Sequence, residues 1–284
     1  CHVLALRQCV PQFGTSGRMT SPIRALVTGG GSGIGAAIAR RLVDEGARVL
    51  ITGRDTSKLQ AIASEAPQQI GILVADLTID ADRKRVAEYA SHWDHVGIDT
   101  LINNAGTGGA GFLEDSNPVQ IDAVLQTNLI APICLTQALL AHLKSLPEAR
   151  IINIGSVFGY IGYPSQAVYS ASKFGLRGFS EALHRELAGT RISVQHVAPR
   201  ATRTALNSNA MDELNRELGN RIDDPDQVAQ VVVAGLSTRR TNKVIGWPEA
   251  LFARVNAVMP LLVDGTLEKQ LPVIRRFIRR GNPS

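Results

Sequence analysis

The sequence predicts an α/β protein built on a single, doubly wound parallel sheet with helices on both faces. Two features predict this fold. From residue 23 onward, short runs rich in β-branched residues alternate with longer helical stretches, which is the pattern of successive βαβ units. In addition, a glycine-rich turn joins the first run to the first helical stretch, at the end of the sheet where such folds bind ligands.

Each element follows from local sequence signals. Gly46 ends the first helix, and Asp224, Pro225 and Gln227 open a late helix as N-cap, first helical residue and capping-box partner. Strands are expected at 23–28, 48–52, 70–74, 100–103, 150–154, 192–198 and 243–247. Helices are expected at 33–45, 57–65, 81–91, 118–145 and 166–188.

The turn after the first strand reads TGGGSGIG at residues 28–35. Phosphate oxygens approach backbone N–H groups closely only where side chains do not block them, so glycine is favoured in such turns. The helix that follows presents its positive end to the same place. The spacing of Gly29, Gly33 and Gly35 differs from the general G-x-G-x-x-G fingerprint, but the position between a first strand and a helix favours dinucleotide binding over a purely structural turn.

The end of the second strand indicates which dinucleotide binds. An acidic residue there would hydrogen-bond a ribose 2′-hydroxyl and repel a 2′-phosphate. This chain has Gly53 followed by Arg54, whose guanidinium can pair with a phosphate. Asp55 would supply a carboxylate if the strand ended one residue later. NADP is therefore expected as the cofactor, with NAD the less favoured alternative.

Tyr169 and Lys173 lie four positions apart in a helical stretch and therefore share one helix face. A nearby ammonium stabilises a phenolate and lowers the pKa of a tyrosine. A tyrosine so tuned can exchange a proton with a carbonyl or carbinol oxygen. Ser156 ends a buried strand thirteen residues earlier, and Asn128 places an amide inside an otherwise apolar helix, where it needs a partner.

From about residue 23 to 205 the chain resembles the short-chain dehydrogenase/reductase family. The resemblance rests on TGGGSGIG at 28–35, Asp76 after the third strand, NNAG at 103–106, Asn128, Ser156 and YSASK at 169–173, in this order. It implies a Rossmann-type sheet and an NADP(H)-dependent oxidoreductase that transfers a hydride between the nicotinamide and a carbonyl or secondary alcohol. His92 and His95 lie three positions apart in a polar stretch and are expected to be solvent-exposed rather than metal ligands, so no metal site is expected.

The resemblance also implies roles for individual residues. Tyr169 would be the general acid in reduction and the base in oxidation, Lys173 would lower its pKa and hold the nicotinamide ribose, Ser156 would bind the substrate oxygen, and Asn128 would support a water relay. The residues implied to bind the cofactor are Thr28, Gly29, Gly31, Ser32, Gly33, Ile34, Gly35, Arg54, Asp76, Leu77, Asn104, Ala105, Gly106, Tyr169, Lys173 and Thr202.

The chain departs from the family at Arg200, where a glycine is usual after Pro199. This places a cation in a turn near the nicotinamide, and we expect Arg200 to bind a polar or anionic substrate. The rest of the expected pocket is apolar, because its candidate lining residues are Phe158, Tyr160, Ile161, Tyr163 and Leu206. A small apolar carbonyl or alcohol is the expected substrate.

These motifs divide the chain into three expected parts. Residues 1–19 are an extension expected to be disordered. Residues 20–250 form the dinucleotide-binding catalytic domain, whose long polar stretch 200–222 is expected to be a lid. Residues 251–284 are a C-terminal helical extension, ending in a basic run beside an apolar side formed by Leu271, Ile274 and Ile278. This helix is expected to be solvated or to face a partner, with peripheral membrane contact as the alternative.

Composition narrows the remaining function classes. Hydrophobic residues make up 44% of the chain, and no stretch reaches the roughly 18 uninterrupted apolar residues that indicate a membrane helix, so no transmembrane segment is expected. The three cysteines lack paired or metal-like spacing, and the cytoplasm is the expected location. The net charge of +5 is spread without a nucleic-acid motif, so nucleic acid is not an expected partner.

Two further questions concern assembly and activity. The resemblance implies a homodimer or homotetramer assembled through the helices near 118–145 and 166–188. The alternative function is a catalytically silent NADP-binding regulatory or scaffold protein. Such proteins lack the tyrosine or the lysine, and this chain has both Tyr169 and Lys173.

Overall fold

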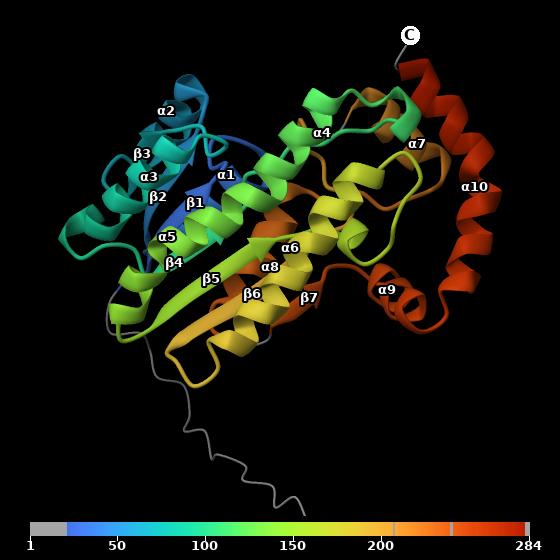
Figure 1. The fold of residues 1–284 in the computed structure, drawn as a ribbon. Coiled ribbons are helices and arrows are strands. Elements are labelled where there is room, and N and C mark those ends of the chain that lie inside the picture. The colour runs from blue at the N-terminus through green and yellow to red at the C-terminus, as the bar shows by residue number, and fades with distance from the viewer. Residues whose placement is uncertain (1–21, 207, 239–240, 282–284) are drawn as a thin grey trace, which may run out of the picture.

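Seven parallel strands form one sheet in the order β3-β2-β1-β4-β5-β6-β7 (Figure 1). The computed structural model describes residues 22–206, 208–238 and 241–281, so the predicted extension at 1–19 lies outside the described residues. The strands are β1 (Arg24–Thr28), β2 (Arg48–Gly53), β3 (Ile70–Val74), β4 (Thr100–Asn103), β5 (Ala149–Ile154), β6 (Ile192–Ala198) and β7 (Asn242–Val244). The strand order reverses between β1 and β4, and such a reversal opens a crevice at the carboxyl edge of the sheet.

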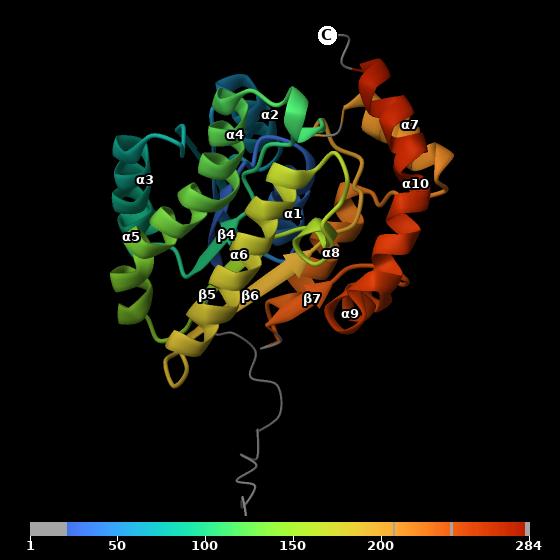
Figure 2. The same cartoon turned by 45° about the vertical axis from the view of Figure 1, so that its right-hand side comes forward.

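Helices cover both faces of the sheet, which confirms the predicted doubly wound α/β fold (Figure 2). One face carries α1 (Gly33–Asp44), α2 (Thr56–Glu65) and α8 (Pro225–Gly235). The other face carries α3 (Asp80–His92), α5 (Ala131–Ser145) and α6 (Ala167–Glu186). Central strands are apolar on both sides because both sides are covered, and β5 is buried at all six positions.

The predicted boundaries agree with the structure to within about two residues, with two differences that have physical causes. The predicted helix 118–145 is divided into α4 (Pro118–Leu125) and α5 by a π-helical turn over Gln126–Ile130. The last strand, predicted at 243–247, ends at Val244 because Gly246 adopts a φ of 103° and turns the chain away. The predicted capping box at Asp224 and Gln227 is present.

The stretch predicted as an irregular lid contains a helix, α7 (Asn209–Glu217). Ser208 caps it by accepting a hydrogen bond from the Met211 N–H at 3.3 Å. Met211 and Leu214 of α7 pack in a small apolar cluster with Ile274 and Ile278 of the C-terminal helix. The lid is therefore held from outside by the C-terminal end of the chain.

Two helices follow β7, namely α9 (Glu249–Val258) and α10 (Pro260–Gly281). The side of α10 predicted to be apolar contacts the lid of the same chain, because Ile274 and Ile278 are buried against α7. Two of the neighbouring arginines also have partners within the chain: Arg276 pairs with Glu217 at 3.0 Å and Arg279 with Glu114 at 2.6 Å. This apolar side therefore faces the same chain, and peripheral membrane contact by the basic C-terminal run stays a prediction.

Among the described helices, the continuous helix Pro118–Ser145 is long and apolar enough to cross a membrane. The pair α9 and α10 meets the same criteria if its 120° bend is counted within one span. The sequence predicted neither, because polar residues such as Asp122 and Asn128 interrupt the apolar runs. Part of the first helix is buried against the sheet, and a core helix of this kind satisfies the same test, so these features are weak evidence of a span.

Candidate active site

The candidate site lies at the carboxyl edge of the sheet, where the turns after β1, β4 and β5 meet. In the turn after β1, Gly29 has a φ of 67°, and a Cβ there would lie 2.9 Å from the Cα of Ala105. A Cβ on Gly31 would lie 3.2 Å from the Cβ of Lys58. Only glycine permits this turn to sit so close to its neighbours. The N–H groups of Gly29 and Gly30 donate to the Thr52 carbonyl at 2.8 and 3.2 Å, which holds the turn against the end of β2.

Helix α1 begins directly after this turn. Ser32 is its N-cap residue and uses no side-chain cap hydrogen bond, and its first turn contains no acidic side chain. The positive end of the helix is therefore not neutralised from within the chain. Gly33 and Gly35 complete the turn, and Ile34 anchors it by packing against the core on the α1 face. The arrangement fits an anionic group at the start of α1.

Thr28 joins the turn after β1 to the turn after β4. Its hydroxyl oxygen accepts hydrogen bonds from the N–H groups of Asn104 and Ala105, both at 2.9 Å. The Asn104 side-chain amide donates in return to the Thr28 carbonyl at 2.9 Å. The structure thus brings together three residues that the sequence predicted to bind the cofactor, Thr28, Asn104 and Ala105. The Thr28 hydroxyl and the Asn104 amide hold the two turns in register.

β2 ends at Gly53, as predicted, so both Arg54 and Asp55 follow the strand. The Asp55 carboxylate caps α2 by accepting a hydrogen bond from the Lys58 N–H at 3.1 Å. The Arg54 side chain is largely exposed, and its guanidinium lies 3.9 Å from the Asp76 carboxylate. Two cations thus follow this strand, Arg54 beside Asp76 and Lys58 at 3.4 Å from the Asp55 carboxylate. No motif in the sequence marks Lys58.

Asp76 and Leu77 follow β3. The Asp76 carboxylate accepts hydrogen bonds from the Thr78 N–H at 2.9 Å and from the Thr78 hydroxyl at 2.7 Å, which fixes a tight turn. The Leu77 side chain is buried in the core on the α3 face, and its carbonyl accepts a hydrogen bond from Arg83 at 2.9 Å. Asp76 thus lies at the edge of the sheet next to Arg54, while the Leu77 side chain belongs to the core.

Asn128 lies in the π-helical turn and is fully buried. Its side-chain oxygen accepts a hydrogen bond from the Thr107 N–H at 2.8 Å, and its amide donates to the Thr107 carbonyl at 2.9 Å and to the Ser172 hydroxyl at 3.2 Å. A Cβ on Gly106 would lie 3.3 Å from the same oxygen. Asn128 thus holds the turn after β4 against α6, and both ends of its amide are already used there.

Ser156, Tyr169 and Lys173 come together as predicted. The Ser156 hydroxyl oxygen accepts a hydrogen bond from the Phe158 N–H at 3.1 Å, which holds it at the end of β5, and its hydroxyl is also hydrogen-bonded to the Tyr169 phenol. Lys173 is buried, its ammonium donates to the Ile154 carbonyl at 3.0 Å, and it lies 5.7 Å from the centre of the Tyr169 ring. The three groups form one polar cluster at the edge of the sheet.

Burial dominates the electrostatics of this cluster. It raises the pKa of Tyr169 to about 12, although the Ser156 hydrogen bond acts in the opposite direction. Burial also lowers the pKa of Lys173 to about 8. In the protein without ligand, the loss of solvent around the phenol thus sets the direction of the Tyr169 pKa shift. That Lys173 lowers the pKa of Tyr169 stays a prediction.

Aromatic residues flank the polar cluster. Phe158 stacks on Tyr163 with ring centres 4.8 Å apart and meets the Tyr169 ring edge-on at 6.3 Å. Both lie where the sequence predicted an apolar pocket. Tyr160 does not, because its ring packs on Arg177 and its hydroxyl lies 3.3 Å from Nδ1 of His196. His196 is fully buried, and burial lowers its pKa to about 3, so it is neutral.

The stretch after β6 crosses the glycine-rich turn. A Cβ on Gly33 would lie 3.1 Å from the methyl carbon of Thr204. Thr202, which the sequence predicted to contact the cofactor, is buried, and its hydroxyl donates to the Arg200 carbonyl at 3.0 Å. The beginning of the predicted lid thus covers the cleft, and Thr204 is a contact that sequence reasoning missed because no motif marks it.

Arg200 does not face the predicted substrate pocket as a free cation. One terminal nitrogen lies 2.6 Å from the Asp223 carboxylate and the other 3.2 Å from Glu249. All three side chains are largely buried. The expectation that Arg200 binds an anionic substrate is therefore wrong. Arg200 instead ties the end of β6 to both the far end of the lid and the start of α9.

The fold and this site define a class of Rossmann-type oxidoreductases. A family model for short-chain dehydrogenases matches residues 24–215, and the chain belongs to that family. Nodulation protein G of Rhizobium sp. strain N33 is 36% identical over 217 residues, which cover 76% of this chain and 82% of that protein.

Solved structures show the same similarity. A short-chain dehydrogenase from Streptomyces avermitilis superposes with a TM-score of 0.75 at 26% identity, covering 90% of this chain and 98% of the other. A 3-ketoacyl-(acyl-carrier-protein) reductase from Brucella melitensis, solved in complex with NADH, superposes with a TM-score of 0.74 at 28% identity, covering 80% of this chain and 98% of the other.

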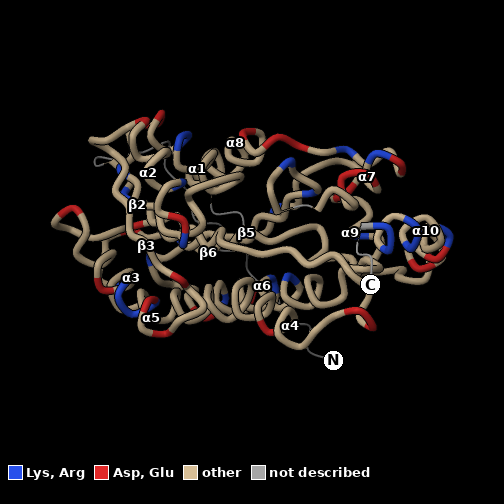
Figure 3. Tube along the Cα trace, turned by 90° about the horizontal axis from the view of Figure 1, so that it is seen from above, with Lys and Arg blue, Asp and Glu red and all other residues tan. Residues whose placement is uncertain are grey.

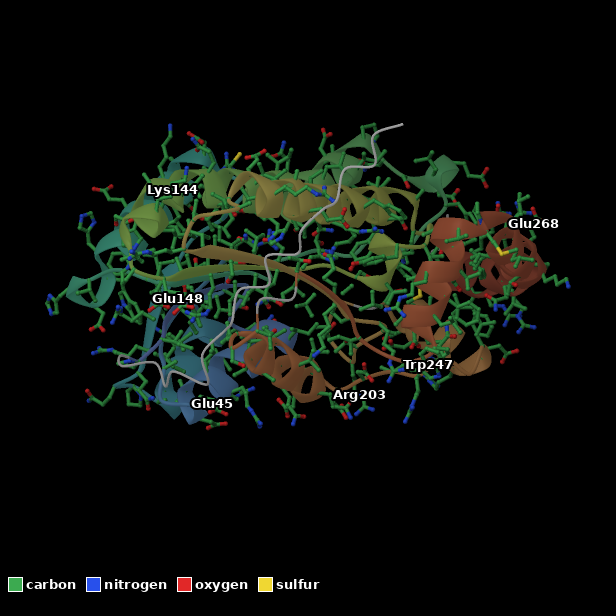
Figure 4. All side chains as sticks on the ribbon, turned by 90° about the horizontal axis from the view of Figure 1, so that it is seen from below. Glu45, Lys144, Glu148, Arg203, Trp247 and Glu268 are labelled. Atoms are coloured by element: carbon green, nitrogen blue, oxygen red, sulfur yellow. The ribbon has the colours of Figure 1, made fainter. Side chains whose placement is uncertain are left out.

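Arg200→Ala leaves two buried carboxylates without their cation, and we expect a loss of about 3 kcal/mol in the free energy of unfolding. Chemical denaturation measures it. Arg203→Ala is the matched control, because Arg203 pairs with Asp224 on the surface with 73% of its side chain exposed (Figure 4), and it should cost less than about 1 kcal/mol. Equal effects of the two substitutions would contradict the structural role of Arg200.

Proposed function

We propose that the protein is an NADP(H)-dependent oxidoreductase that transfers a hydride between the nicotinamide and a carbonyl or secondary alcohol of a small, apolar substrate. The observation that carries the proposal is the cluster of Ser156, Tyr169 and Lys173 at the edge of the sheet, with the Tyr169 phenol hydrogen-bonded to Ser156 and the Lys173 ammonium buried beneath. The turns that meet at this edge lie at the reversal of strand order, where dinucleotides bind in this class of sheet.

The residues around the cleft fit a dinucleotide. The glycine-rich turn is a cradle that a Cβ at Gly29 or Gly35 would fill, and the start of α1 supplies unneutralised N–H groups for the pyrophosphate. When bound, the dinucleotide supplies the hydride to, or accepts it from, the reacting carbon. The dinucleotide would lie along the edge of the cleft that is formed by Thr28, Asn104, Ala105 and Gly106.

The protein's own groups handle the proton. In reduction, Ser156 holds the carbonyl oxygen and Tyr169 donates its phenolic proton to that oxygen as it becomes an alcohol; in oxidation, the phenolate accepts the alcohol proton. Lys173 supplies the positive charge that stabilises the phenolate during this transfer. Asn128 keeps the turn after β4 in place, and a water relay from Lys173 would pass beside it.

The cofactor preference follows from the charges after β2. Arg54 is exposed and Lys58 lies beside the glycine-rich turn, so a 2′-phosphate would meet two cations. Asp55 uses one carboxylate oxygen to cap α2, and its other oxygen lies 3.4 Å from the Lys58 ammonium. These contacts favour NADP over NAD, although the Brucella relative was solved with NADH.

The substrate class follows from the aromatic wall. Phe158 and Tyr163 stack beside Tyr169, and the lid contributes Leu206 near Gly108. Arg200 is neutralised by Asp223 and Glu249 and does not select an anionic substrate. An apolar carbonyl, such as that of an acyl chain or ring, suits this wall.

We also propose that the protein assembles as a homodimer or homotetramer through the face formed by α4, α5 and α6. Ile130 and Phe174 are exposed on these helices, and the π-helical turn contacts α6. Large exposed apolar residues of this kind are typical of subunit interfaces.

Tyr169→Phe removes the proton donor and leaves the fold intact. We expect the rate of NADPH-dependent carbonyl reduction to fall by about 10²–10⁴-fold, while NADPH binding, followed by fluorescence titration, changes little. Tyr89→Phe, on the exposed side of α3, is the control and should retain full activity. Wild-type protein that binds NADPH but turns over no ketone, aldehyde or quinone would instead favour the silent regulatory protein.

The pH dependence follows from Lys173. Burial lowers its pKa from 10.5 to about 8, so the ammonium is present below pH 8 and lost above it. The Tyr169 phenol, whose pKa is about 12, stays protonated over the same range. The value of kcat/KM for reduction should therefore be level below pH 8 and then fall about tenfold per pH unit. A level profile up to pH 10 would show that the charge of Lys173 is not required.

Arg54→Asp replaces the cation at the end of β2 with a carboxylate. We expect the ratio of kcat/KM with NADPH to that with NADH to fall by roughly 10–100-fold, because a charge-assisted bond to the 2′-phosphate is replaced by repulsion. Arg41→Asp, which makes the same charge change on the exposed side of α1, should leave the ratio unchanged. A similar fall in both variants would indicate only a general electrostatic effect.

A further inference from the structure

Helix α10 covers the outer side of the aromatic wall that begins at the proposed proton donor. Phe158 lies edge-on to the Tyr169 ring and stacks on Tyr163, whose ring centre is 4.8 Å away. Tyr163 packs in turn against the apolar cluster that contains Ile274 and Ile278 of α10. Two aromatic rings therefore lie between the Tyr169 ring and the C-terminal helix.

One face of α10 lies along this wall over several turns. Its apolar residues recur three or four positions apart and therefore share a helix face, namely Leu267, Leu271, Ile274 and Ile278. The two leucines line a hollow of about 250 Å³ together with Gly162 and Pro164, which flank Tyr163 in the chain. The two isoleucines are buried in the cluster against which Tyr163 packs. This face of α10 therefore covers Tyr163 and its neighbours from outside.

The same helix bridges two segments that border the proposed cleft. On one side, the buried isoleucines of α10 pack against Met211 and Leu214 of α7. On the other side, the Arg279 guanidinium pairs with Glu114 at 2.6 Å and lies 5.8 Å from the centre of the Phe112 ring. Seen from above, α10 stands at one end of the molecule, with charged residues of both signs around it (Figure 3). α10 thus joins the lid helix α7 to the segment that follows β4.

The lid and the segment after β4 also approach each other directly. A Cβ on Gly108 would lie 2.9 Å from the Leu206 carbonyl oxygen, so the two backbones are in close contact. The two segments are therefore held together at two places, at Gly108 and across α10. A long or bulky group on the substrate would have to separate them and expose Ile274 and Ile278. Burial of each such side chain is worth about 1.5–3 kcal/mol, so the packing of α10 opposes this opening.

We propose that α10 is the end wall of the substrate site, so that the site accepts short, free carbonyl compounds and excludes long acyl chains and acyl groups attached to a carrier protein. This inference rests on the proposed function and narrows its substrate class. Ile274 and Ile278 are the specificity-determining residues, because they pack in the same cluster as Tyr163 at the end of the aromatic wall. The match to the family model ends at residue 215, so the family relationship by itself does not predict this wall.

A series of unbranched 2-ketones, from butan-2-one to decan-2-one, tests the wall. Ile274→Ala removes part of it, so the ratio of kcat/KM for decan-2-one to that for butan-2-one should rise about tenfold, because the added methylenes gain apolar space. Ile62→Ala is the matched control, since it removes the same atoms from a buried position on α2, on the opposite side of the molecule from α10 (Figure 1). It should leave the ratio unchanged, because a loss of stability alone lowers both values together.

A comparison of free and carrier-bound substrates tests the exclusion of macromolecules. Wild-type protein should reduce a short 3-oxoacyl thioester of N-acetylcysteamine with a kcat/KM roughly 100-fold above that for the same acyl group on an acyl-carrier protein. The reason is that entry of the carrier-bound group would require both isoleucines of the wall to be exposed. Equal values for the two substrates would overturn the exclusion of carrier-bound groups.

The results separate a failure of the end wall from a failure of the proposed function. If wild-type protein reduces the ketones but Ile274→Ala leaves the ratio unchanged, α10 does not limit the site and the proposed function stands. If wild-type protein reduces none of them, the proposed function fails, and the same ketones are then titrated into the complex with NADP⁺ by calorimetry. Ile274→Ala should again favour decan-2-one about tenfold. An unchanged preference, or no binding of any ketone, would overturn the end wall.

Discussion

The candidate site depends on the two hydrogen bonds by which the Thr28 hydroxyl holds the N–H groups of Asn104 and Ala105. β1 and β4 are neighbours in the sheet, yet their following connections leave toward opposite faces. A crevice opens between those connections, and Thr28 fixes its width. Gly29 lies so close to Ala105 that no other residue type fits there. This contact positions the glycine-rich turn and the start of α1 together with the hydrogen bonds from the Gly29 and Gly30 N–H groups to the Thr52 carbonyl.

A second constraint is the burial of Lys173. An ammonium inside a protein is costly unless its hydrogen bonds are satisfied, and the Ile154 carbonyl supplies one of them. The same burial brings the pKa of Lys173 down to about 8 and that of Tyr169 up to about 12. Without ligand, the Tyr169 phenol is therefore neutral, and the Lys173 ammonium loses its proton more easily than an exposed lysine does. A bound dinucleotide and substrate would alter this balance, which suits a site whose task is to move one proton.

Beyond this edge, the region after β6 is held together by contacts between segments distant in the sequence. Arg200 joins the end of β6 to Asp223 and Glu249, and α10 packs its buried isoleucines against α7. The Asn256 side chain of α9 also donates a hydrogen bond to the Tyr160 carbonyl, in the segment that follows Ser156. The predicted lid and the C-terminal helices are therefore joined by contacts on both sides of the proposed site.

The fold class, the order of elements and the grouping of Ser156, Tyr169 and Lys173 could be predicted from the sequence, because strand and helix periodicity and i to i+4 spacing are local properties. Other features depended on tertiary contacts. The direction of the Tyr169 pKa shift is set by how much solvent the fold removes. The carboxylates that neutralise Arg200 lie 23 and 49 residues away. The sequence of α10 indicates an amphipathic helix, but it does not indicate that the apolar side faces the predicted lid. Local pattern determined which groups the chain carries, and long-range packing decided which of them face one another, the core or the solvent.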